Sequence, residues 1–187
     1  ILTKGDDAYG INNVGDNNMT TVSGSITTKD DDATGIYNSG DDNTTNVSET
    51  GIILTKGDDA YGINNVGDNN TTTVSGNIKT EDDDATGIYN SGDTNKTTVS
   101  GIIKAEGYLA TGIYNLGHNN TTNVSGIITT EGNDGDGIYN KGDNNTTNVS
   151  GNIKTEGTGA LGIYNDFADT NTTTLSGRIT TTGDYAH

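Results

Sequence analysis

The chain has 187 residues, 28% of them hydrophobic, with one Phe, no Trp and no Cys, and its formal net charge is −17. Because a globular domain has about 45–50% apolar residues, this composition excludes a large compact core, a disulfide scaffold and a thiolate metal site. Nine scattered basic residues, and no apolar run of about 18 residues, argue against nucleic-acid binding and against direct membrane insertion by this segment.

A four-residue phrase recurs along the chain at nearly constant spacing. Gly-Ile-Tyr-Asn or Gly-Ile-Asn-Asn begins at Gly10, Gly35, Gly62, Gly87, Gly112, Gly137 and Gly162. The step is 25 residues in every case but one, where the insertion Glu49-Thr50 makes it 27. A fixed period of this size is typical of a repeat array. We therefore interpret residues 1–187 as a single array and, since both ends fall within a repeat, expect a fragment of a longer solenoid.

Each repeat contains three short runs separated by turn residues. The first is I-x-T, as in 26–28, the second is A-x-G-I-Y-N, as in 33–38, and the third is T-T-x-V-S, as in 146–150. β-Branched residues dominate these runs, and no helical period or helix cap is present. Gly, Asn and Asp between the runs tolerate positive φ. The sequence predicts an all-β fold, a parallel β-solenoid (β-helix) of about seven coils, with three short strands in each coil of about 25 residues.

Stacking such coils about 4.8 Å apart would align equivalent residues into ladders along the axis. Four rows of small or apolar residues are expected to point inward. They are Val22, Val47, Val74, Val99, Val124, Val149 and Leu175; Ile26, Ile53, Ile78, Ile103, Ile128, Ile153 and Ile179; Ile11, Ile36, Ile63, Ile88, Ile113, Ile138 and Ile163; and Ala8, Ala33, Ala60, Ala85, Ala110 and Ala160, with Gly135 in one copy.

One asparagine position is occupied in every repeat. Its members are Asn13, Asn38, Asn65, Asn90, Asn115, Asn140 and Asn165. Side-chain amides stacked in register bond to one another, as in cross-β ladders. We expect a structural ladder, and the alternative is a row of ligand-binding amides.

The repeat resembles the passenger repeats of bacterial autotransporters and filamentous-haemagglutinin-like adhesins. The string that carries the resemblance is G-x-I-x-T-x-G-x-x-A-x-G-I, seen in 151–163 and, with Asp82 in place of its second glycine, in 76–88, and similar strings cover nearly the whole chain. The resemblance implies a parallel β-helix, usually right-handed, displayed outside the cell and often adhesive. A surface filament or sheath protein of another kind of microbe is the alternative.

From this resemblance we expect an extracellular or cell-surface structural and adhesive protein, forming a stalk, surface fibre or filament. Its partners would be further copies in a fibre, or ligands on a host or neighbouring cell. The alternative is a carbohydrate-binding or calcium-binding solenoid module. A fibre predicts uniform coils without a pocket, whereas a carbohydrate site predicts a groove with aromatic or acidic irregularities. The tyrosine row that would serve a glycan is Tyr37, Tyr89, Tyr114, Tyr139 and Tyr164.

The acidic turns are candidates for calcium. Asp30, Asp31 and Asp32 form one such turn, and Asp82, Asp83 and Asp84 form another. Carboxylate oxygens are the ligands that Ca²⁺ prefers, but the glycine-rich pattern of calcium-binding β-rolls is missing. A solvated turn is the simpler interpretation, and no other cofactor is expected.

Asn-x-Ser/Thr sequons recur in the same part of each repeat, so a row of surface glycans is a further hypothesis. The candidate positions are Asn43, Asn46, Asn70, Asn95, Asn120, Asn123, Asn145, Asn148 and Asn171.

Two other activities are not expected. The only histidines, His118 and His187, occupy variable positions, and near-identical coils leave no unique catalytic site, so we predict no enzyme. An ice-binding face needs a regular T-x-T array. The threonines here are adjacent pairs, and Lys79, Lys104 and Lys154 interrupt the I-x-T run.

Overall fold

The computed structural model describes residues 1–166 and 170–187, and over these residues the chain forms β-strands and no helix. The strands make three parallel sheets of seven strands each. The first sheet contains β1 (Tyr9–Val14), β4 (Thr34–Ser39), β7 (Tyr61–Val66), β10 (Thr86–Ser91), β13 (Thr111–Leu116), β16 (Ile138–Lys141) and β19 (Ile163–Asp166). The second contains β2 (Met19–Val22), β5 (Thr44–Val47), β8 (Thr71–Val74), β11 (Lys96–Val99), β14 (Thr121–Val124), β17 (Thr146–Val149) and β20 (Thr172–Leu175). The third contains β3 (Ser25–Lys29), β6 (Ile52–Lys56), β9 (Asn77–Glu81), β12 (Ile102–Glu106), β15 (Ile127–Glu131), β18 (Asn152–Glu156) and β21 (Arg178–Thr182).

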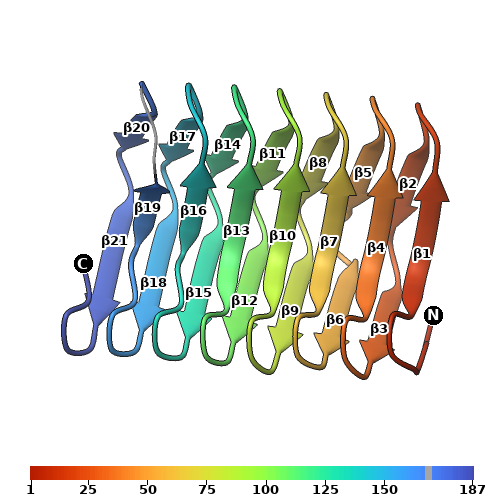
Figure 1. Ribbon diagram of the computed structural model, residues 1–187, viewed down its shortest axis with the longest axis horizontal. Helices are drawn as coiled ribbons and strands as arrows, with labels where there is room; N and C mark the ends of the chain where they lie inside the picture. The colour runs from red at the N-terminus through yellow and green to blue at the C-terminus, as the bar shows by residue number, and fades with distance from the viewer. Residues whose placement is uncertain (167–169) are drawn as a thin grey trace.

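Each strand pairs with the equivalent strand one coil away, so the chain winds as a solenoid (Figure 1). The register is one repeat in all three sheets: Ile36 lies opposite Ile63, Val47 opposite Val74 and Ile53 opposite Ile78. The insertion Glu49-Thr50 is exposed and lies in the turn between β5 and β6, outside both strands. The predicted fold class, coil length and number of coils are confirmed.

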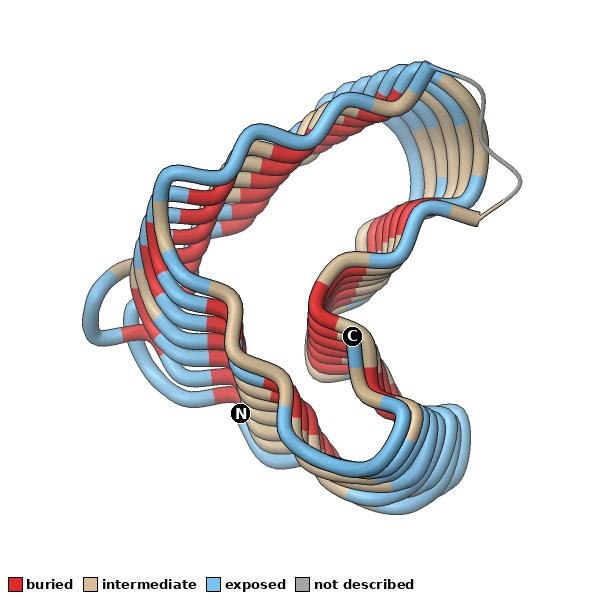
Figure 2. Tube along the Cα trace, turned by 90° about the vertical axis from the view of Figure 1, so that its left-hand side faces the viewer, coloured by how far each residue is buried: buried red, intermediate tan, exposed pale blue. Residues whose placement is uncertain are grey.

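The core is a narrow strip inside the coil, where the three sheets face one another (Figure 2). Burial alternates along the strands, as in the pattern of β8, where Thr72 and Val74 point inward. The predicted Val and Ile rows form one buried cluster, with the inner members at most 5% exposed. Leu175 pairs with Val149 but is 48% exposed, because no further coil packs on the last one in this structure. Burial of each fully buried Ile or Val side chain of this cluster contributes about 1.5–3 kcal/mol to the free energy of folding.

Close packing requires a glycine at the first position of the repeated phrase. A Cβ built on Gly87 would lie 2.5 Å from Ile103 Cγ2 and 2.6 Å from the carbonyl oxygen of Gly112. Any larger residue would therefore push the first sheet away from both the core and the next coil. The same contacts recur down the row, which explains why the position is glycine in every coil.

The asparagine row expected to form a ladder is continuous through the molecule. Each Nδ2 donates to the Oδ1 of the equivalent asparagine in the next coil, at 2.7–2.9 Å, from Asn13 to Asn165. The same amide also donates to a threonine hydroxyl of its own coil, as Asn90 does to Thr97 at 3.0 Å. The inner rungs are 1% exposed. These bonds join the first sheet to the second within a coil and join successive coils along the axis.

Removing one rung tests how much the ladder stabilises the fold. In Asn90→Ala the Oδ1 of Asn115 and the Oγ1 of Thr97 lose their donor, and each buried polar atom left unpaired costs about 1–3 kcal/mol. We expect a lower free energy of unfolding by chemical denaturation. The control is Asn77→Ala, an exposed asparagine on the third sheet. Equal effects of the two substitutions would contradict the ladder's role.

Candidate functional site

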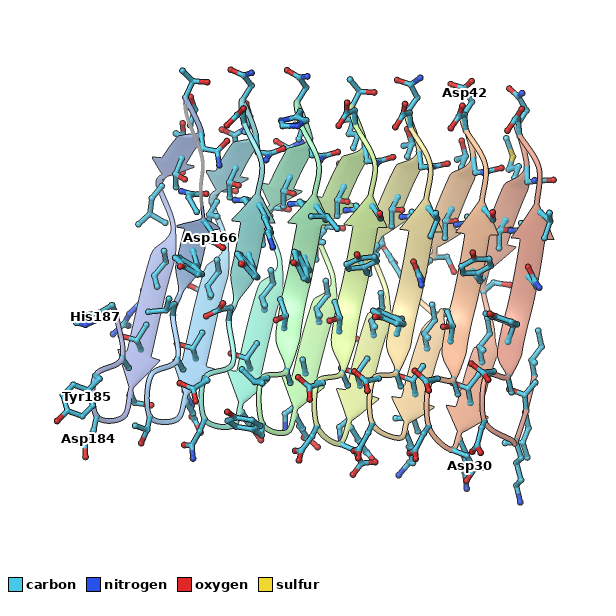
Figure 3. The ribbon with its side chains drawn as sticks, in the orientation of Figure 1. Asp30, Asp42, Asp166, Asp184, Tyr185 and His187 are labelled. Carbon is cyan, nitrogen blue, oxygen red and sulfur yellow. The ribbon has the colours of Figure 1, made fainter. Side chains whose placement is uncertain are left out.

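A row of tyrosines crosses the outer face of the first sheet (Figure 3). In each strand the isoleucine and asparagine of the repeated phrase point inward, so the tyrosine between them points outward. The ring centroids of Tyr89 and Tyr114 are 5.2 Å apart, those of Tyr114 and Tyr139 are 4.6 Å apart, and those of Tyr139 and Tyr164 are 5.0 Å apart. The structure thus brings four of the five predicted tyrosines, Tyr89, Tyr114, Tyr139 and Tyr164, into contact along the axis, whereas the ring that Tyr37 contacts is that of Tyr9.

Two further tyrosines join this row, and the repeat pattern did not include them. Coils with Gly-Ile-Asn-Asn have an asparagine in the row, but their tyrosine comes three residues earlier. The ring of Tyr61 lies 5.3 Å from that of Tyr89, and the ring of Tyr9 lies 5.0 Å from that of Tyr37. In the sequence, Asn replaces Tyr within the phrase of these two coils, and this replacement was the signal that could have identified the two extra tyrosines.

A groove of about 320 Å³ runs beside the row. One wall is made by the rings of Tyr61, Tyr89, Tyr114 and Tyr139. The other wall comes from the turns that precede these strands, and four carboxylates line the groove: Asp59, Asp84, Asp134 and Asp136. The groove is therefore aromatic on one side and acidic on the other, and no Lys or Arg lines it.

Asp136 is the irregular member of the groove. Three other coils have a buried threonine at this position, namely Thr34, Thr86 and Thr111. Burial raises the pKa of Asp136 to about 6, an effect opposed by the Leu161 N–H, which donates to its Oδ1 at 3.3 Å, and reinforced by the charge of Asp134. An acidic group that titrates near neutral pH thus replaces a neutral hydroxyl beneath the tyrosine row.

The ring orientations divide the row into two parts. The ring planes of Tyr114, Tyr139 and Tyr164 are within 17° of parallel, so these rings cover one another's faces. Tyr139 Oη also donates to Asp166 Oδ2 at 2.6 Å. The ring planes of Tyr89 and Tyr114 are at 85°, and those of Tyr61 and Tyr89 are at 46°. Tyr61 and Tyr89 are therefore not stacked face to face with their neighbours in the way that the rings from Tyr114 to Tyr164 are.

The aspartates proposed as calcium ligands bond to backbone amides of neighbouring coils. Asp30 Oδ2 accepts from the Gly5 N–H at 2.9 Å and Asp82 Oδ2 from the Gly57 N–H at 3.0 Å. Asp31 Oδ1 accepts from the Asp58 N–H, and Asp83 Oδ1 from the Tyr108 N–H. Asp32 and Asp84 have positive φ, at 55° and 54°. Among the described residues no three metal-ligating side chains converge; calcium binding at these turns stays a prediction.

Five of the asparagines assigned as sequons form a second buried ladder that sequence reasoning missed. They are Asn43, Asn70, Asn95, Asn120 and Asn145, at most 2% exposed. The backbone N–H of each donates to the side-chain Oδ1 of the equivalent residue in the next coil at 2.7–2.8 Å. For Asn145, the last of the five, that residue is Asn171. The Nδ2 atoms of four of them donate to turn carbonyls, as Asn145 does to that of Gly142, whereas Asn70 Nδ2 is buried without a hydrogen-bond partner among the described residues.

A glycan on one of these five amides would require the coil to open. The side chains of Asn46, Asn123 and Asn148 lie instead on the outer face of the second sheet. Glycosylation at those three positions stays a prediction.

The outer face of the third sheet has a different chemistry, with lysines and glutamates in two neighbouring rows that form ion pairs within and between coils. Lys79 Nζ lies 2.6 Å from Glu81 Oε1 and 3.1 Å from Glu106 Oε2, and Lys104 bridges Glu106 and Glu131 in the same way. Hydrogen bonds from Lys56 and Lys79 lower the pKa of Glu81. The three sheets thus present an aromatic face, a hydroxyl-rich face whose one charged residue is Lys96, and a charged face.

Comparison of the chain with protein-family models, with curated proteins and with solved structures gives no match. Within the described residues no helix is long and apolar enough to cross a membrane. Function is therefore inferred from the geometry of the coil and its faces.

Replacing Asp136 tests its environment. With a pKa of about 6 in the folded state and about 3.9 when unfolded, the folded chain binds the proton more tightly. Stability contributed by this group therefore falls as pH rises from about 4 to about 6 and stays reduced above that range. We expect Asp136→Thr to be more stable than the parent at neutral pH, with the advantage disappearing below about pH 4. Chemical denaturation at a series of pH values measures this, and an advantage that does not change with pH would contradict it.

Proposed function

We propose that the chain is part of the shaft of an extracellular stalk, surface fibre or filament that serves a structural and adhesive role. The observation that carries the proposal is the unbroken register of all three sheets over the seven coils. A cross-section that repeats without change makes an object whose length is set by the number of coils. An elongated spacer of this kind is what a surface stalk requires.

The bonding along the axis suits a mechanical role. Every junction between inner coils is crossed by three strand pairings and by two asparagine ladders. A force along the axis would therefore load many hydrogen bonds together at each junction. The acidic turns, for example Asp41, Asp68 and Asp93, would keep neighbouring shafts hydrated and apart.

Labelling of intact cells of the source organism tests the proposed location. Antibodies raised against the folded solenoid, with gold-conjugated secondary antibodies, should decorate projections or a layer outside the cell in electron micrographs. Cells lacking the gene provide the control. Labelling that requires permeabilised cells would contradict the proposal.

A second candidate function is carbohydrate binding in the groove of the first sheet. The observation that favours it is the combination of unstacked rings at Tyr61 and Tyr89 with the acidic irregularity at Asp136. Sugars stack on open aromatic faces, and carboxylates accept hydrogen bonds from their hydroxyls. The groove runs across several coils, which suits a linear oligosaccharide.

A glycan array tests this candidate. We expect the folded chain to retain at least one class of oligosaccharide and Tyr89→Ala to lose that signal, because an aromatic ring that lines the groove is removed. The matched control is Tyr185→Ala, since Tyr185 is 83% exposed and lies outside the row. No retained glycan, or equal binding by both variants, would exclude the groove as a carbohydrate site.

A further inference from the structure

The second sheet separates the adjacent threonines of the repeat onto opposite faces. In β8, Thr72 is buried and accepts from Asn65 Nδ2 at 3.0 Å, whereas Thr71 and Thr73 point outward. In five of the seven strands the outer face therefore reads Thr-x-Thr or Thr-x-Asn, although the sequence shows adjacent pairs; in β2 and β11 the first of the two positions is Met19 and Lys96, respectively. The lysines that interrupt the I-x-T run, such as Lys79, lie on the third sheet and do not interrupt this face.

These outward residues form two straight rows that follow the strand register. The first row is Met19, Thr44, Thr71, Lys96, Thr121, Thr146 and Thr172. The second row is Thr21, Asn46, Thr73, Thr98, Asn123, Asn148 and Thr174. Members of a row are about 4.8 Å apart, and the two rows are about 6.6 Å apart, the rise of two residues. The face, which we call the threonine array, is thus a lattice of hydroxyls, methyls and amides with two fixed repeats.

The threonine array is almost free of charge, in a chain of net charge −17. Its one charged residue is Lys96, whereas the third sheet carries neighbouring rows of lysines and glutamates. Within the described residues, the one hydrogen bond between side chains of the array joins Asn148 Nδ2 to Asn123 Oδ1 at 3.0 Å. The other hydroxyls and amides of the array are therefore free to bond to a partner. The spacing and lack of charge of this face would match a partner that is uncharged, rigid and periodic in two directions.

We propose that the threonine array binds the surface of ice crystals. The oxygen lattice of ice repeats along one direction at a distance close to the spacing between coils. Hydroxyl and amide groups in register hydrogen-bond to such a lattice, while the threonine methyl groups order the intervening water. The backbone cannot drift from this spacing, because the buried ladders of Asn90 and its equivalents hold the coils in place. This inference goes beyond the proposed shaft and does not depend on it.

Lys96 interrupts the first row between Thr71 and Thr121. A long charged side chain keeps a tightly held hydration shell that does not fit an ice plane. The array therefore consists of two stretches, with the longer one on β14, β17 and β20. Converting Lys96 to threonine would join the two stretches into one, so the structure predicts a gain of function as well as a loss.

The test measures thermal hysteresis and the fraction of the folded chain that a growing ice hemisphere takes up. We expect the parent chain to show both effects, Lys96→Thr to show more of each, and Thr146→Lys to lose most of each. The matched control is Thr129→Lys on the third sheet, where Lys104 and Lys154 occupy the same row, and it should behave as the parent does. Circular dichroism melting would verify that all four chains are folded.

Three results would overturn the proposal. The first is a folded parent chain with neither hysteresis nor uptake into ice. The second is an equal loss in Thr146→Lys and Thr129→Lys, since the effect would then not belong to this face. The third is retention of the parent chain on crystalline cellulose or chitin without uptake into ice, because the lattice recognised would then be a polysaccharide.

Discussion

The structure depends on one constraint: each coil must carry the same inward side chains at the same positions as the coils on either side of it, so that they can pair. The core is only a few apolar residues wide, so burial of Ile and Val does not by itself fix the register. The asparagine ladders do, because a shift by one residue would leave buried amides without partners. The buried threonines of the third sheet show the contrast: Thr55 and Thr80 have unpaired hydroxyls, and Ala105 replaces them in one coil. Their methyl groups fill space, whereas the asparagines carry the specificity.

Because buried side chains determine the register, the outside of the coil is free to vary. The inward positions are nearly identical in every coil, but the outward ones differ between sheets and sometimes between coils. Tyrosine alternates with asparagine on the first sheet, and Lys96 stands in a row of threonines on the second. Asp136 departs from this pattern, because it replaces a threonine that is buried in three other coils. Burial raises the pKa of its carboxyl group as a result. Function on such a scaffold is therefore a property of faces that extend over several coils.

The period, the three strands and the apolar ladders could be predicted from the sequence, because each is a repeat of one residue type at fixed phase. What could not be predicted is the direction of neighbouring polar side chains. Asn70 and Thr73 are close in the same coil, yet one is buried in a ladder and the other faces solvent. The sequon motif around Asn70 contains no information on that choice, since the turn decides it. The groove was hidden for a related reason: its walls come from coils that are adjacent in space and 25 residues apart in sequence.

The two-residue insertion Glu49-Thr50 has a consequence for how such a molecule changes over time. The strands on both sides keep their pairing with the next coil, Val47 with Val74 and Ile53 with Ile78. Extra chain at this corner thus alters neither the interior nor the pitch. The corner is a place where a longer segment can be spliced in and carried as a side branch. Residues 1–18 and 53–70 are identical, so whole coils can be copied as units. Duplication would change how far the molecule reaches, while insertion would change what it carries.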